Sequence, residues 1–364
     1  GVNAGAFVAA NLANQMTPAQ MCRIFVRNEA DVHPFHPQVF YKPAFEEYMT
    51  RAKRVPSLVA QAILSFLRHP NDQSLLEALT ILTQAVPAGV FDNEGFHQYL
   101  SSSYSSIGRT NDFARLSREL RVIATDLESG ETVRFGDPDQ RSIPISRAIQ
   151  ASMAAPGLYT PVHYGGRYYL DGTLNKGMHT SVALENGADV VLAINPVVPV
   201  DARAAVAQGT LPEGALTHSG MPNILSQTYR AMVTSRLQSG LRTIARDYPK
   251  AKVHLFQPNP SDVHLFFKSV FSFHARKVLC EQAYQITRQQ LRERLDELAP
   301  SFEQLGISVR EEVLHDQSRN LKTGLYIESV PYFRAETDAA EETGVVESIS
   351  QRSSALLKRA ASWI

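Results

Sequence analysis

Glycines flank a single polar residue at the start of the chain, in Gly1-Val2-Asn3-Ala4-Gly5, and an alanine-rich stretch follows at once. With serine in the third place, this pattern is a nucleophile elbow, a sharp strand-to-helix turn that lifts a hydroxyl above a sheet. Such a hydroxyl performs acyl transfer when a base and donors for the oxyanion lie beside it. Asn3 cannot do this, because a carboxylate cannot deprotonate an amide. Asparagine does tolerate strained backbone angles, so it can keep the turn and remove the chemistry.

A second signature lies far downstream, in Tyr169-Leu170-Asp171-Gly172. It places an acid at the end of an expected strand, with glycine directly after it. Two plainer interpretations stay open for these motifs. An aspartate at this point can simply cap a turn, and the first five residues suit any glycine-rich helix start.

Two more stretches accompany these signatures, and with them the chain resembles the patatin-like phospholipase family. That family carries G-x-S-x-G on an elbow and D-G-G or D-G-A far downstream. The stretches similar to it are Ala148–Pro156, followed by Tyr159-Thr160-Pro161-Val162, and Leu265–Arg276. The resemblance covers roughly residues 1 to 298. Thr173 departs from the pattern, since glycine or alanine is usual two places after the aspartate.

The resemblance implies a fold and a domain organisation. The fold is a three-layer α/β hydrolase with a central, mostly parallel sheet and a helical insertion at about residues 42–111. The phospholipase domain is expected over residues 1–300, and a C-terminal extension over residues 301–364. We also expect a strand and a glycine-rich oxyanion loop to precede Gly1. In the extension, the acidic segment RAETDAAEETG indicates a flexible linker, and a short terminal helix follows it.

The resemblance also implies roles for individual residues. Members of the family hydrolyse carboxyl esters of phospholipids or acylglycerols with a Ser–Asp dyad, without a metal or an organic cofactor. Carried over, Asn3 stands at the nucleophile position, Asp171 is the base, and the N–H of Ala4 is an oxyanion donor. Gly1, Gly5 and Gly172 complete the two motifs. The implied partner is a lipid or acyl-ester substrate, with peripheral membrane contact.

Three hypotheses remain for the function. The chain is a lipase family member whose serine has been replaced, or a silent relative that binds acyl lipids or a partner without cleaving them. Outside the family, it is an α/β binding module that uses its glycine-rich start as an anion nest. The sequence alone does not choose between the first two.

Alternating helices and strands must position these residues, and the alternation indicates an α/β core. Thr17-Pro18-Ala19-Gln20 is a helix start with a capping box. Two hairpins are predicted, Leu120–Phe135 around Ser129-Gly130 and Val162–Leu170 around Gly165-Gly166. The other predicted helices are Ala4–Asn14, Ala44–Lys53, Ser57–Arg68, Asp72–Gln84, Ile145–Ala155, Met178–Asn186, Ile224–Tyr248 and His274–Leu298, and the other predicted strands are Val190–Ile194 and Val253–Phe256.

The composition limits the partners and the compartment. The 364 residues include 36 basic and 36 acidic side chains, which gives no electrostatic reason to expect nucleic acid. Two cysteines are too few for a disulfide framework. No apolar run reaches the roughly eighteen residues that a membrane span requires. We expect a cytoplasmic protein, or one peripheral to the inner face of a membrane.

Four other segments each have two interpretations, one functional and one purely structural. His33 and His36 suit a loop better than a metal site, because no further ligand stands at metal spacing. Ser101–Ser106 is interpreted as a solvated loop and not as a replacement nucleophile. The aromatic run Leu265–Phe273 is core or a lipid-facing patch. The final stretch, SSALLKRAASWI, is a frayed helix or a membrane-docking one.

Overall fold

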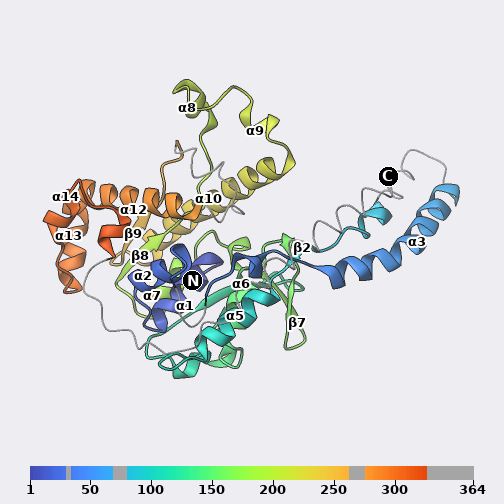
Figure 1. The fold of residues 1–364 in the computed structure, drawn as a ribbon, viewed down its shortest axis with the longest axis horizontal. Coiled ribbons are helices and arrows are strands. Elements are labelled where there is room, and N and C mark those ends of the chain that lie inside the picture. Colours follow the sequence, from blue (N-terminus) through green and yellow to red (C-terminus); the bar gives the residue numbers. More distant parts are fainter. Residues whose placement is uncertain (30–33, 69–79, 262–274, 326–364) are drawn as a thin grey trace, which may run out of the picture. The chain divides into compact units, whose positions relative to one another are not determined.

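The computed structural model describes residues 1–29, 34–68, 80–261 and 275–325 (Figure 1). The described residues all belong to one compact unit, Gly1–Ile327. Four sequence predictions concern segments outside the described residues: His33, the aromatic run Leu265–Phe273, the acidic linker and the terminal helix. Most of a fifth, the predicted helix Asp72–Gln84, also lies outside them, because only residues 80–84 of it are described.

Four strands form the sheet that carries Asp171. Their order is β4 (Thr132–Phe135), β3 (Val122–Asp126), β7 (Arg167–Asp171) and β6 (Val162–Tyr164), and all neighbours are antiparallel. Both predicted hairpins are present within it. Gly130, Gly165 and Gly166 have positive φ at their turns, which glycine adopts without steric cost. Val2 adds a parallel bridge to β3.

Two smaller sheets accompany this one. In the first, β2 (Gly89–Asp92) pairs antiparallel with β1 (Lys42–Pro43) and parallel with β5 (Gly157–Tyr159). In the second, β8 (Val190–Ile194) and β9 (Lys252–Phe256) are parallel. The α/β class is confirmed. The described sheets are mixed and not mostly parallel, because the two hairpins force antiparallel neighbours in the largest of them.

Helices of widely different length connect the strands. The α-helices are α1 (Ala4–Ala13), α2 (Pro18–Met21), α3 (Phe45–Arg68), α5 (Glu94–Tyr104), α6 (Ile145–Ser152), α7 (Thr180–Glu185), α8 (Ala202–Ala207), α9 (Ala215–His218), α10 (Met221–Asp247), α12 (Arg276–Glu293), α13 (Leu295–Gln304), α14 (Glu311–His315) and α15 (Leu321–Gly324). Short 3-10 or π turns lie at η1 (Cys22–Val26), η2 (Pro37–Phe40), η3 (Phe113–Arg115), η4 (Pro138–Gln140) and η5 (Gly172–Leu174). The capping box predicted at Thr17 is present at the start of α2.

Three predicted helix boundaries were wrong. The predicted helices 44–53 and 57–68 form one helix, α3, with Pro56 inside it. Proline removes only one backbone hydrogen bond, and Ala52, whose carbonyl loses that partner, is exposed to water. The predicted helix 274–298 is divided at Arg294 into α12 and α13. The serine run is not a loop, because α5 continues through Tyr104.

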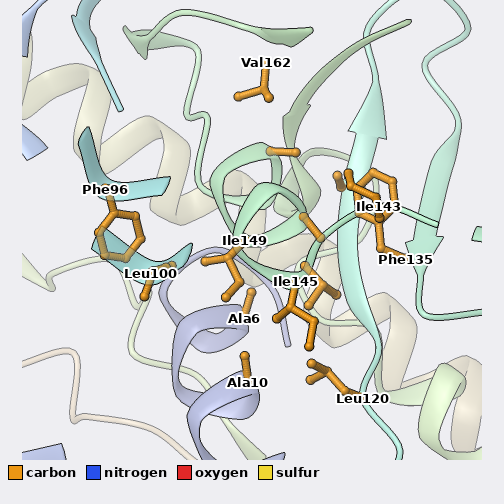
Figure 2. Packing of buried hydrophobic residues seen from close by; sticks show 14 of the residues in the cluster. Ala6, Ala10, Phe96, Leu100, Leu120, Phe135, Ile143, Ile145, Ile149 and Val162 are labelled. Carbon is orange, nitrogen blue, oxygen red and sulfur yellow. The ribbon is translucent and has the colours of Figure 1, made fainter. Parts of the chain in front are cut away.

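The main core lies where α1, α5 and α6 pack together beside the four-stranded sheet (Figure 2). Ala6 and Ala10 of α1 lie against the large apolar side chains of its neighbours, such as Ile149 of α6 and Phe96 of α5. Small alanine side chains let the helices approach closely. Each fully buried isoleucine or phenylalanine contributes about 1.5–3 kcal/mol relative to an exposed one. Among the described helices, none has the length and apolar character that crossing a bilayer demands.

Candidate active site

The chain makes a sharp turn at Asn3. Val2 pairs with Ile123 of β3, the Ile123 N–H donates to the Gly1 carbonyl at 3.0 Å, and α1 begins at Ala4. Asn3 has φ 51° and ψ −128°. A conformation of this kind costs a non-glycine residue on the order of 1–3 kcal/mol. Surrounding contacts must therefore hold Asn3 in place.

The Asn3 carbonyl accepts from the Ala6 N–H at 2.9 Å in the first turn of α1. Three further hydrogen bonds hold Asn3, and two of them use its amide side chain. Its Nδ2 donates to Asp171 Oδ2 at 2.5 Å, and its Oδ1 accepts from the Ala4 N–H at 2.6 Å. Its backbone N–H donates to Ser152 Oγ at 2.9 Å. The side chain thus joins the predicted base to the predicted oxyanion donor. In this chain the Ala4 N–H is bonded to Asn3 and is not free for a substrate oxygen.

Asp171 ends β7 and is fully buried, with 0% of its surface exposed. Its Oδ1 accepts from the N–H and the hydroxyl of Thr173, each at 2.9 Å. Its Oδ2 accepts from Asn3 and from the Tyr229 hydroxyl at 3.2 Å. Thr173, where the sequence departs from the family pattern, therefore supplies two donors to the carboxylate.

The C-terminal end of α6 and the residues just after it form hydrogen bonds to both Asn3 and Asp171. Ser152, its last residue, accepts the Asn3 N–H, and the carbonyl of Ala154 just beyond accepts the Asp171 N–H at 3.0 Å. Asn3 and Asp171 are 168 positions apart in the chain. The segment between Ala148 and Pro156, noted in the sequence for its resemblance, thus has a physical role, because it fixes the distance between these two residues.

Two of the three motif glycines are required by close packing. A Cβ on Gly1 would lie 2.4 Å from the Gly5 carbonyl oxygen, and one on Gly172 would lie 2.3 Å from the Ile123 carbonyl oxygen. No side chain fits at such distances. A Cβ on Gly5 would meet nothing within 4 Å. Close packing therefore explains why positions 1 and 172 are glycine. At Gly5 packing would allow a side chain, and the glycine leaves open space beside the Asn3 turn.

Tyr229 and Ser152 are residues of the site that the sequence analysis missed. Tyr229 lies on α10, and its hydroxyl contacts both Asp171 and the Thr173 hydroxyl. No local motif surrounds it, so helical periodicity alone could not single it out. Ser152 lies inside the stretch Ala148–Pro156, which the sequence analysis noted for its resemblance to the family. Its position at the end of α6 was the available signal.

Burial sets the protonation of these groups. It raises the pKa of Asp171, although hydrogen bonds from Thr173, Asn3 and Tyr229 act in the opposite direction. Burial and then the charge of Asp171 raise the pKa of Tyr229, so the phenol stays a donor. Burial lowers the pKa of His179 to about 4. At neutral pH this imidazole is neutral, and it bonds the Gly172 carbonyl through Nε2 at 3.0 Å.

Other residues noted in the sequence do not join this cluster. His36 precedes a short 3-10 turn. Ser103, in the serine run, is buried, and its Oγ accepts from Arg109 at 2.8 Å. Within the described residues, no three His, Cys, Asp or Glu side chains gather as a metal site would need.

A second cluster has the residue types of a catalytic triad. His254 of β9 contacts Ser301 Oγ through Nε2 at 2.8 Å and Glu297 Oε1 through Nδ1 at 3.4 Å. Hydrogen bonds from Arg294 lower the pKa of Glu297 to about 2. Ser301 lies inside α13 and is only 4% exposed. A substrate carbonyl cannot approach its Oγ, so the cluster serves to join β9 to α13.

A comparison with known protein families identifies a match for the first half of the chain. A family described as patatin-like phospholipase matches residues 1–184 of the chain. The match spans just over half of the 364 residues and contains both Asn3 and Asp171. It ends within α7, so Tyr229 lies beyond it.

Proposed function

The chain belongs to the patatin-like phospholipase family, and we propose that Asn3 and Asp171 occupy the nucleophile and base positions of that family. We also propose that Asn3 makes the site catalytically inactive, because its side chain is not a nucleophile. The family-level function is lipid acyl hydrolysis, and lipids are the implied substrates. The chain as written binds an acyl lipid in this site without cleaving it. We further propose that the phospholipase domain ends near residue 300, before the C-terminal extension.

One observation carries the proposal. The Asn3 side chain donates to Asp171 and accepts from the Ala4 N–H at the same time. These are the two groups that a nucleophilic hydroxyl and its oxyanion would use. An amide therefore satisfies both while offering no nucleophile. The same arrangement disfavours an anion nest at this turn, because the Asp171 carboxylate lies beside it.

A hydroxyl at position 3 would complete an acyl-transfer site. In an Asn3→Ser variant, its oxygen attacks the ester carbonyl carbon while its proton passes to Asp171. The carbonyl oxygen becomes an oxyanion and accepts from the Ala4 N–H, which the substitution frees. The bond to the leaving alcohol then breaks, and that alcohol takes the proton from Asp171. Water enters and hydrolyses the acyl-enzyme by the same steps.

The test is release of product from a short-chain fluorogenic acyl ester. Three proteins are compared: the chain as written, Asn3→Ser, and Asn3→Ser with Asp171→Ala. We expect Asn3→Ser to raise turnover by on the order of 10³-fold or more, because loss of a nucleophile costs up to about 10⁶ in another serine hydrolase. We expect the added Asp171→Ala to abolish the gain.

A matched control separates the dyad from general effects on the protein. Ser301→Ala in the Asn3→Ser background removes a buried hydroxyl far along the chain and leaves turnover unchanged. If Asn3→Ser folds but stays inert, the base and donor positions are not those proposed. In that case a lipid-binding or scaffold role that does not depend on the dyad replaces the proposal.

A further inference from the structure

Helix α3 has an exposed apolar stripe along one side. Its members are spaced by multiples of three and four residues and therefore share a face; they are Phe45, Met49, Val59, Ile63 and Leu67. Each is between 39% and 69% exposed. Ala52 and Pro56 continue the same line through the middle of the helix. We refer to these five large side chains as the α3 stripe.

The other side of α3 is already attached to the protein. Leu58 and Ala62 are buried there. Glu47 accepts from Arg51 at 2.9 Å and from the Ala88 N–H at 3.2 Å, and Arg51 donates to the Gln84 carbonyl at 2.9 Å. The Tyr48 hydroxyl donates to the Val90 carbonyl at 3.0 Å. The helix is thus held by one face while the stripe on the other faces solvent.

The charges of α3 fit an anionic surface. The helix contains four basic and two acidic residues, and Glu47 is paired with Arg51. Lys53 and Arg54 are exposed on the polar side. A helix with a sharp apolar face, low overall hydrophobicity and cations on its polar side is typical of helices that lie in the plane of a membrane interface.

A bilayer suits the stripe better than a second copy of the chain. The spacing of the stripe would also suit a coiled-coil seam, but Pro56 lies on that seam. A proline ring offers no flexible apolar side chain to insert between the residues of a facing helix, so Pro56 disfavours the continuous knobs-into-holes packing that a helix pair requires. The headgroup region of a bilayer is deformable and does not require such regular packing.

We propose that the α3 stripe inserts into the headgroup region of an anionic phospholipid bilayer and seats the protein on the surface that holds its substrate. The 24 residues of α3 extend about 36 Å along that surface at 1.5 Å per residue. The link to substrate rests on the proposed function. The docking itself does not, because it requires no hydrolysis.

The experiment is flotation of the full chain, as written, with phospholipid vesicles. The vesicles are phosphatidylcholine alone or with about one quarter phosphatidylglycerol, which supplies the anionic surface. We expect the parent to float with both and more with the anionic ones. Met49→Glu with Ile63→Glu should lower the partition coefficient at least about tenfold, because two large apolar side chains leave the interface.

The matched control is Thr50→Glu with Gln61→Glu, which makes the same charge change on the exposed polar side of α3. On neutral vesicles this control should bind like the parent, because the apolar stripe is intact. Equal loss in both double variants, or no binding by the parent, overturns the proposal. So does a parent dimer that dissociates only in the stripe variant, since the stripe would then join two copies.

A second measurement avoids acidic substitutions altogether. Trp363 is the chain's single tryptophan, so Trp363→Phe provides a background without tryptophan. In it, Ile63→Trp should show a blue-shifted emission on adding anionic vesicles, whereas Gln61→Trp should not. Equal emission shifts at both positions would contradict insertion of the stripe.

Discussion

Two clusters in this molecule bring together the residue types of hydrolytic chemistry, and we propose that neither is a catalyst, for opposite reasons. The His254–Ser301–Glu297 cluster has a nucleophile and a base at hydrogen-bond distance, but its serine is buried inside a regular helix. The Asn3–Asp171 cluster has a strained turn, a buried carboxylate and a backbone N–H donor, but it has an amide at the position that we propose for the nucleophile.

The difference shows that placement decides what a set of side chains does. Ser301 lies within α13, directly after Pro300, and its hydrogen bond to His254 joins that helix to β9. Asn3 sits at positive φ, and three hydrogen bonds are used to keep it there. Strain of this kind is commonly retained where a site needs it. In the function that we propose, the geometry of a reactive turn is kept here while the reactive atom is absent.

Ser152→Ala should give the largest effect on the Asn3 turn short of changing Asn3 itself. It leaves the partly buried N–H of Asn3 without its Ser152 acceptor, and a fully buried unpaired donor costs about 1–3 kcal/mol. We expect the free energy of unfolding in urea to fall by up to that amount. In the Asn3→Ser background, turnover should also fall, because the turn loosens.

Ser146→Ala is the control for this prediction. Ser146 is also fully buried on α6, and its Oγ accepts from Asn111 Nδ2 at 2.9 Å. Its loss should lower stability by a similar amount and leave turnover of the Asn3→Ser protein unchanged. If both substitutions lower turnover equally, Ser152 acts only through general stability.

Tyr229→Phe should shift the pH dependence of hydrolysis in the Asn3→Ser protein. Asp171 acts as a base only when ionised, so the rate rises as the pH passes its pKa. Removing the Tyr229 donor raises that pKa further, because the carboxylate loses a hydrogen bond. A bond to a charged group is worth about 1.5 kcal/mol, so the acidic limb should move up by about one pH unit.

The readout is the pH profile of kcat/KM. Tyr248→Phe, at the other end of α10, is the control and should leave the profile in place. If the acidic limb of the Tyr229→Phe profile has the same midpoint pH as that of the parent, or a lower one, Tyr229 does not stabilise the Asp171 anion.

Ser301→Ala should have the smallest effect. It removes one hydrogen bond to His254, and we expect the free energy of unfolding to fall by about 1 kcal/mol. Any ester hydrolysis by the chain as written, or by Asn3→Ser, should be unaffected. A drop in hydrolysis on this substitution would reverse the comparison and make the His254 cluster the reactive one.

The sequence predicted those parts of the fold and site that depend on local patterns. Glycine marked the turn at Asn3 and the one after Asp171, and the hairpin turns followed from Ser129-Gly130 and Gly165-Gly166. The structure then shows why Gly1 and Gly172 are small, since each lies against another backbone.

Features that depend on distant contacts could not be predicted. Tyr229 reaches Asp171 across 58 positions from a helix whose own sequence pattern shows only helical periodicity. The continuity of α3 through Pro56 depends on solvent around the helix, whereas the local rule favours a break at proline. The Asn3 Oδ1 accepts from the Ala4 N–H because of the rotamer that the Asn3 side chain adopts. No sequence motif predicts that rotamer.

Covalent labelling of Asn3→Ser with a fluorophosphonate, followed by intact-mass and peptide mass spectrometry, tests the central claim most directly. In this reaction a phosphorus–oxygen bond forms at the introduced hydroxyl, fluoride leaves, and Asp171 takes the proton. We predict one adduct, on the N-terminal peptide, and none in the chain as written or when Asp171→Ala is added. A folded Asn3→Ser protein that stays unlabelled, or one labelled at Ser301, would contradict the account.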